Sequence, residues 1–84
     1  MCNERLGYSL VEANRLAEAQ AIFIFAIEKF PRSAYSYDGL ADVAARRGDF
    51  TTAIRHFQTS LEMDPDNDYA VRGLARAREG RRMH

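Results

Sequence analysis

The sequence predicts an all-α fold, and two observations carry that prediction. Alanine and arginine, which favour helix, are the commonest of the 84 residues, while valine and isoleucine are few and no strand-length run alternates apolar with polar residues. A pattern of small, apolar and aromatic residues that closes at Pro31 also recurs and closes again at Pro65. Each unit holds two stretches of helical periodicity, so we expect helical hairpins that repeat along the chain.

The first unit is expected to hold two helices, at about residues 3–13 and about residues 16–30. Between them, Asn14 suits a turn because asparagine tolerates a left-handed backbone. The second helix should end before Pro31, since the residue before a proline avoids helical geometry.

The second unit is expected to hold helices at about residues 34–47 and about residues 50–63. Ser33 and Asp49 are N-cap candidates for these two helices, and Gly48 is a C-cap candidate between them.

The segment after the second unit predicts a turn and then a fifth helix. Residues 64–67 have the composition of a turn, and the last helix should cover about residues 68–81. Asp68 at its start and arginines at its end suit the helix dipole. We therefore expect one domain, 1–84, with a first repeat at about 1–33, a second at about 34–67 and a final helix at about 68–82.

Charge and cysteine content limit the setting in which the protein works. The formal net charge is zero, but residues 1–68 carry a net −4 and residues 69–84 a net +4. Cys2 is the single cysteine, so no internal disulfide is expected and a reducing, cytoplasmic location is the simple interpretation. No apolar stretch approaches ~20 residues, which predicts no membrane span, and the N-terminus has no signal-peptide pattern.

The repeated positions resemble the tetratricopeptide repeat (TPR) family, whose period of about 34 residues equals the spacing of the two prolines. The resemblance departs at Asn3, where the family has an aromatic residue, and at Asn14, where it has glycine. The second unit carries eight matching positions: Tyr37, Leu40, Ala41, Gly48, Ala53, Phe57, Ser60 and Pro65. The first unit carries six: Leu6, Gly7, Ala19, Phe23, Ala26 and Pro31. The resemblance implies a right-handed α-solenoid of five helices, made of two TPR hairpins and a C-terminal capping helix, that binds a protein or peptide partner.

A narrower resemblance covers residues 6–10, 21–23 and 30–40. These segments are similar to the repeat tail of bacterial beta-lactamase-like or esterase hydrolases, with Gly39 where that tail has serine. It implies an alternative function, an accessory or dimerising tail without a ligand of its own, and it transfers no catalysis.

The family resemblance places a concave groove on the first helix of each pair. Tyrosines beside charged residues suit peptide recognition there, and we expect an acidic side on the first and third helices and a basic side on the fifth. The alternative is that these are solvated helix faces. The expected groove residues are Glu4, Tyr8, Glu12, Tyr35, Asp38, Asp42, Arg46, Tyr69, Arg72 and Arg76.

Some TPR proteins grip a C-terminal carboxylate with lysines and asparagines. The corresponding positions cannot form that clamp, so no binding of chaperone C-terminal tails is expected. They are Glu4, Tyr8, Gly39, Tyr69 and Gly73.

The second helix carries apolar residues at positions that the family usually keeps polar. Ile24 and Phe25, with Ile22 beside them, are expected to form an apolar patch through which the protein self-associates as a homo-oligomer or docks on another domain. The alternative is that the helix is rotated and Phe25 belongs to the core.

The sequence offers no arrangement typical of an enzyme. His56 and Cys2 have no ligands or bases at suitable spacing, no serine has a nucleophile-elbow setting and no phosphate-binding glycine loop is present. We therefore expect no catalysis, metal or cofactor. The basic stretch at 72–82 is short and lacks interleaved aromatics, which argues against nucleic acid as a partner.

Overall fold

A computed structural model describes residues 15–83, and this part of the chain is all-helical. The four helices are α2 (Leu16–Lys29), α3 (Ala34–Arg46), α4 (Phe50–Met63) and α5 (Asp68–Arg82). Their bounds agree with the predicted ones to within a residue. The predicted first helix at 3–13 lies outside the described residues, so five helices and a handed solenoid remain predictions.

The turn between α3 and α4 is built as its sequence predicts. Gly48 has φ +83°, a backbone conformation that glycine adopts without strain. The Gly48 N–H donates to the carbonyl of Ala45, and the Asp49 N–H reaches back to Ala44, which is the Schellman arrangement. The Asp49 carboxylate then accepts a hydrogen bond from the Thr52 N–H (3.3 Å) and caps α4. One short turn therefore ends one helix and starts the next.

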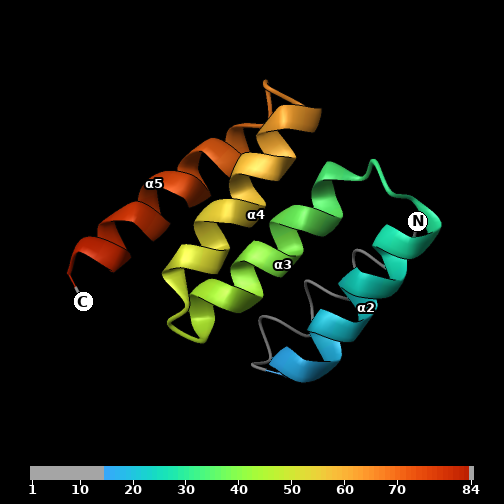
Figure 1. Cartoon of the computed structure of the whole chain (residues 1–84), viewed down its shortest axis with the longest axis horizontal. Helices are drawn as coiled ribbons and strands as arrows, with labels where there is room; N and C mark the ends of the chain where they lie inside the picture. Colours follow the sequence, from blue (N-terminus) through green and yellow to red (C-terminus); the bar gives the residue numbers. More distant parts are fainter. Residues whose placement is uncertain (1–14, 84) are drawn as a thin grey trace.

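Each described helix lies beside the next one in the chain, and consecutive helices run in opposite directions (Figure 1). As a result α3 and α5 run the same way, and they also contact each other directly. Side chains at matching positions of α3 and α5 therefore stand next to one another on one surface.

The core repeats with the same period as the sequence. The ring of Phe23 in α2 packs on Gly39 of α3, and the ring of Phe57 in α4 packs on Gly73 of α5. Both phenylalanines are buried, and in each case a Cβ on the glycine would overlap the ring. The helices approach closely because these positions lack a side chain.

Small residues complete the interior between the helices. Ala19 and Ala53, which occupy equivalent positions of the two repeat units, are both fully buried, as is Ala41. The larger buried cluster joins α3, α4 and α5, and a smaller one among the described residues joins α2 and α3. Among residues 15–83, three polar residues are also fully buried: Ser36, Asp38 and Ser60.

Candidate binding surface

The most distinctive surface of the described chain is formed by α3 and α5, and we call it the α3–α5 surface. Tyr35 and Tyr69 occupy equivalent positions near the starts of the two helices, and Asp42 and Arg76 are equivalent near the middle. With Arg46, these residues define the surface. All five were predicted groove residues.

A hydrogen bond crosses this surface from α5 to α3. The Tyr69 hydroxyl donates to the Asp42 carboxylate. Burial and this bond raise the pKa of Tyr69, so its hydroxyl keeps its proton. Burial also raises the pKa of Asp42, against the opposing effects of the Tyr69 hydrogen bond and of Arg76 and Arg46 nearby. Predicted groove residues from two helices thus meet in one polar contact.

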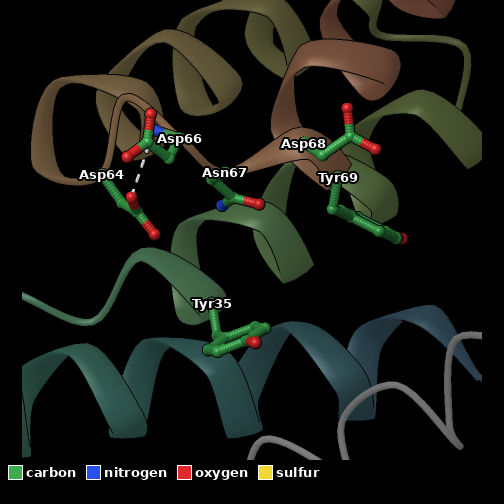
Figure 2. Close-up of a pocket in the computed structure, with 6 residues that line it drawn as sticks. All are labelled: Tyr35, Asp64, Asp66, Asn67, Asp68 and Tyr69. Atoms are coloured by element: carbon green, nitrogen blue, oxygen red, sulfur yellow. Dashed lines mark hydrogen bonds between the residues drawn. The ribbon is translucent and has the colours of Figure 1, made fainter.

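Beside the starts of α3 and α5 lies a pocket of about 540 Å³. Its size falls within the range of ~300–1,000 Å³ typical of ligand sites. Tyr35 lies on one side, opposite the α4–α5 turn and the first residues of α5 (Figure 2). The lining residues are Tyr35, Asp64, Asp66, Asn67, Asp68 and Tyr69, which include three carboxylates and no cationic side chain.

The three aspartates of the pocket belong to the turn and its exit into α5. The Asp64 carboxylate accepts a hydrogen bond from the Asp66 N–H (3.2 Å), which holds the turn closed. Asp68 pairs with Arg72 one helical turn later (2.8 Å), with both side chains largely exposed. Exposed pairs of this kind contribute only ~0–1 kcal/mol, so Asp68 can still interact with another cation.

Asp38 differs from the prediction that placed it in the groove. Its side chain is fully buried, because the α4–α5 turn covers it. One carboxylate oxygen accepts a hydrogen bond from the Asn67 side-chain amide (2.8 Å), and the other has no hydrogen-bond partner among the described residues. Burial raises the pKa of Asp38, although hydrogen bonds from Asn67 and Ser60 oppose the rise. Asp38 is therefore part of the protein interior and is not accessible to a ligand.

Asn67 is the residue that the sequence analysis missed. Its amide nitrogen donates to Asp38 in α3 and to Ser60 in α4 (3.0 Å), and its oxygen accepts from the Ala70 N–H at the start of α5 (3.4 Å). One side chain thus caps a helix and joins three helices beneath the pocket. The sequence did contain a signal for this role. Asn67 lies one repeat period after the cap candidate Ser33, and asparagine is a residue type favoured at N-caps.

The charge pattern of the described surface also differs from the expected one. We expected an acidic third helix facing a basic fifth helix. Instead the exposed aspartates of the pocket gather in the α4–α5 turn and at the start of α5, whereas the first turn of α3 has no acidic residue. Arg46 and Arg76 lie further along α3 and α5. We call Arg46 and Arg76 the arginine end of the α3–α5 surface. Arg72, also a predicted groove residue, is exposed and pairs with Asp68.

Glu4, Tyr8 and Glu12, the remaining predicted groove residues, lie outside the described residues. On α2, Ile24 and Phe25 are 42% and 46% exposed, and Ile22 is partly buried. Phe25 is therefore not a core residue, which removes the alternative of a rotated helix. Lys29 lies over the Phe25 ring, with its Nζ 5.4 Å from the ring centroid.

Among residues 15–83, no group of three or more His, Cys, Asp or Glu side chains is arranged to hold a metal ion. No helix in this part of the chain is long and apolar enough to cross a bilayer.

Comparison with known proteins agrees with the repeated packing. The profile of the tetratricopeptide repeat family matches residues 4–68 and, in a second overlapping match, residues 39–82. The chain is also 28% identical over 67 residues to the mouse (Mus musculus) Superkiller complex protein 3, a match that covers 80% of this chain and 4% of that protein. Together, the family profile, the two helix-ending prolines and the paired Phe–Gly contacts show that this chain belongs to the tetratricopeptide repeat family.

Proposed function

We propose that this chain is a non-catalytic module that binds a peptide or protein partner through the α3–α5 surface. Tetratricopeptide repeats generally mediate protein–protein interaction. Glu4, Tyr8 and Glu12 of the predicted first helix would extend the same surface as a concave groove. We also propose a cytoplasmic location. The proposed repeats cover about 1–33 and 34–67, and the final helix covers about 68–82.

The observation that carries the proposal is the side-by-side placement of equivalent α3 and α5 residues. Tyr35 and Tyr69 are exposed to 63% and 42%, and charged residues lie close to them on the same surface. Tyrosine rings supply large contact areas at low entropic cost and are enriched at binding hot spots. We further propose that no chaperone-tail clamp forms. Two of the positions that the clamp would use are Gly39 and Gly73, which have no side chain and are buried against phenylalanine rings.

A peptide array tests this proposal directly. The protein should bind a subset of a diverse array of twelve-residue peptides, and Asp42→Arg or Arg76→Glu should weaken most of that binding severalfold. Glu62→Arg, at an exposed position of α4, is the matched control and should leave binding unchanged. Binding that survives both surface variants, or an array without any ligand, would refute the assigned surface.

As a second candidate function, we propose that the α2 patch of Ile22, Ile24 and Phe25 mediates association with a second copy of the chain. The exposure of two large apolar side chains on one helix supports this, because such patches often mark interfaces. An accessory or dimerising role of the kind implied by the hydrolase-tail resemblance would use the same patch.

Analytical ultracentrifugation at increasing concentration tests the association. Phe25→Ser should shift the protein toward the monomer, whereas Val71→Ser, at a similarly exposed position of α5, should not. A protein that is monomeric at high micromolar concentration would exclude self-association.

A further inference from the structure

We propose that the partner segment carries a lysine or arginine that enters the pocket beside Tyr35 and Tyr69, and an acidic residue that meets the arginine end of the α3–α5 surface. This inference deepens the proposed function and rests on it. The occupant is a peptide segment of another protein with opposite charges at a defined separation.

The pocket has the chemistry that a cationic side chain needs. Two tyrosine rings border it, and aromatic faces attract ammonium and guanidinium groups within ~6 Å. Asp64, Asp66 and Asp68 surround the same space, and none of the residues that line it is cationic. The long apolar stem of lysine or arginine can lie against the rings while its charge meets the carboxylates.

A divalent metal is not the better occupant. The three aspartates are part of the described chain, in which no group of three or more His, Cys, Asp or Glu side chains is arranged to hold a metal ion. Two of the six lining residues are aromatic, and aromatic rings suit an organic cation better than a hydrated metal ion.

The other end of the surface carries the opposite charge. Arg46 and Arg76 are exposed, and the single carboxylate between them, Asp42, already accepts the Tyr69 hydrogen bond. Two guanidinium groups near one carboxylate leave a net positive end, which favours an acidic side chain of the partner.

The distance between the two ends sets the spacing of the partner's charges. Tyr69 precedes Arg76 by seven residues and Tyr35 precedes Arg46 by eleven, which at a helical rise of 1.5 Å per residue is roughly 10–16 Å. An extended peptide advances ~3.3 Å per residue. The cationic and acidic residues of the partner should therefore lie about three to five residues apart.

Phage display of fully randomised ten-residue peptides tests this inference. The enriched sequences should pair Lys or Arg with Asp or Glu three to five residues away. The double variant Asp66→Asn with Asp68→Asn should bind these peptides about five- to tenfold more weakly, since it removes two charges at the pocket. Glu28→Gln with Glu62→Gln removes the same charge from exposed positions elsewhere and should leave binding unchanged.

Chemical-shift mapping with one enriched peptide then locates the pocket. The largest changes should include the amides of Tyr35, Asn67 and Tyr69, and replacing the peptide's Lys or Arg by norleucine should abolish them. Enriched peptides without the charge pair, or with binding unaffected by the pocket variant, would overturn this inference while leaving the proposed binding function intact. A library that yields no enriched peptide would overturn both.

Discussion

At the residue scale, the contact of the Phe57 ring with Gly73 leaves no room for a side chain at the glycine. In an exposed helix, glycine to alanine gains about 1 kcal/mol. Here the added methyl would overlap the ring, and overpacking costs about 1–3 kcal/mol. We predict that Gly73→Ala lowers the free energy of unfolding by up to about 2 kcal/mol, measured by urea denaturation.

Ala75 in the same helix provides the control, because it is exposed. Ala75→Gly should cost about 1 kcal/mol from helix propensity alone. If Gly73→Ala stabilised the protein instead, the close approach of α4 and α5 at this point would be wrong.

The second residue-scale prediction concerns the buried carboxyl of Asp38. Burial, with smaller repulsive effects of Asp42 and Asp64, raises its pKa above the ordinary 3.8, so the folded state binds this proton more tightly than the unfolded state. The contribution of Asp38 to stability is therefore present at low pH and is lost as the pH rises through the raised pKa. We predict that Asp38→Asn flattens the dependence of unfolding free energy on pH above about pH 4.

Urea denaturation at several pH values checks this, with Asp66→Asn as the control at an exposed position of the neighbouring turn. The curve should not become level, because burial also raises the pKa of Asp42. An Asp38→Asn curve parallel to that of the wild type would show that Asp38 does not titrate differently on folding.

At the element scale, α5 depends on Asn67 for both its start and its attachment. Asn67→Ala removes the cap of α5 and the donor to buried Asp38, and we predict a loss of about 2–4 kcal/mol of unfolding free energy. Asp49→Ala removes the comparable but exposed cap of α4 and should cost only about 1 kcal/mol. Amide hydrogen exchange in the first turn of α5 should accelerate in the Asn67 variant.

Asn67→Asp separates the two roles, since aspartate caps helices as well as asparagine does but cannot donate to Asp38. It should be nearly as destabilising as Asn67→Ala at neutral pH. If Asn67→Asp were as stable as the wild type, the helix cap alone would account for the contribution of Asn67 to stability.

The helices were largely predictable from the sequence because their ends carry local signals. Pro31, Gly48 and Asp49 each act within a few residues, so the bounds of α2, α3 and α4 follow from neighbours in the chain. The small residues Ala19, Ala41 and Ala53 are also placed by the family spacing, and all three are fully buried.

The surface was less predictable because it depends on residues far apart in the chain. Helical spacing puts Asp38 on the same side of α3 as Asp42, and only the α4–α5 turn, distant in the sequence, buries it. The pocket also needs Tyr35 to lie opposite residues 64–69, a relation that no local pattern contains.

At the scale of the whole molecule, the repeat makes each helix depend on its neighbours. In such arrays stability is roughly a sum of local terms and nearest-neighbour interfaces, and the terminal helix shields the last apolar face. In this chain α5 covers Phe57. Phe57 belongs to the buried cluster of α3, α4 and α5, to which α5 contributes Ala70 and Ala77.

We therefore predict that a chain ending after Asp66 loses cooperative folding. Without α5, the face of Phe57 that packs on Gly73 is exposed and Asp38 loses its donor Asn67. Circular dichroism should show reduced helicity with a broad thermal transition, and the truncated protein should bind an apolar dye. A chain ending at Arg82 retains all of α5 and should behave as the full chain does. If the chain ending after Asp66 unfolded as sharply and at the same temperature, α5 would be an appendage, and the α3–α5 surface would lack the rigid support that binding requires.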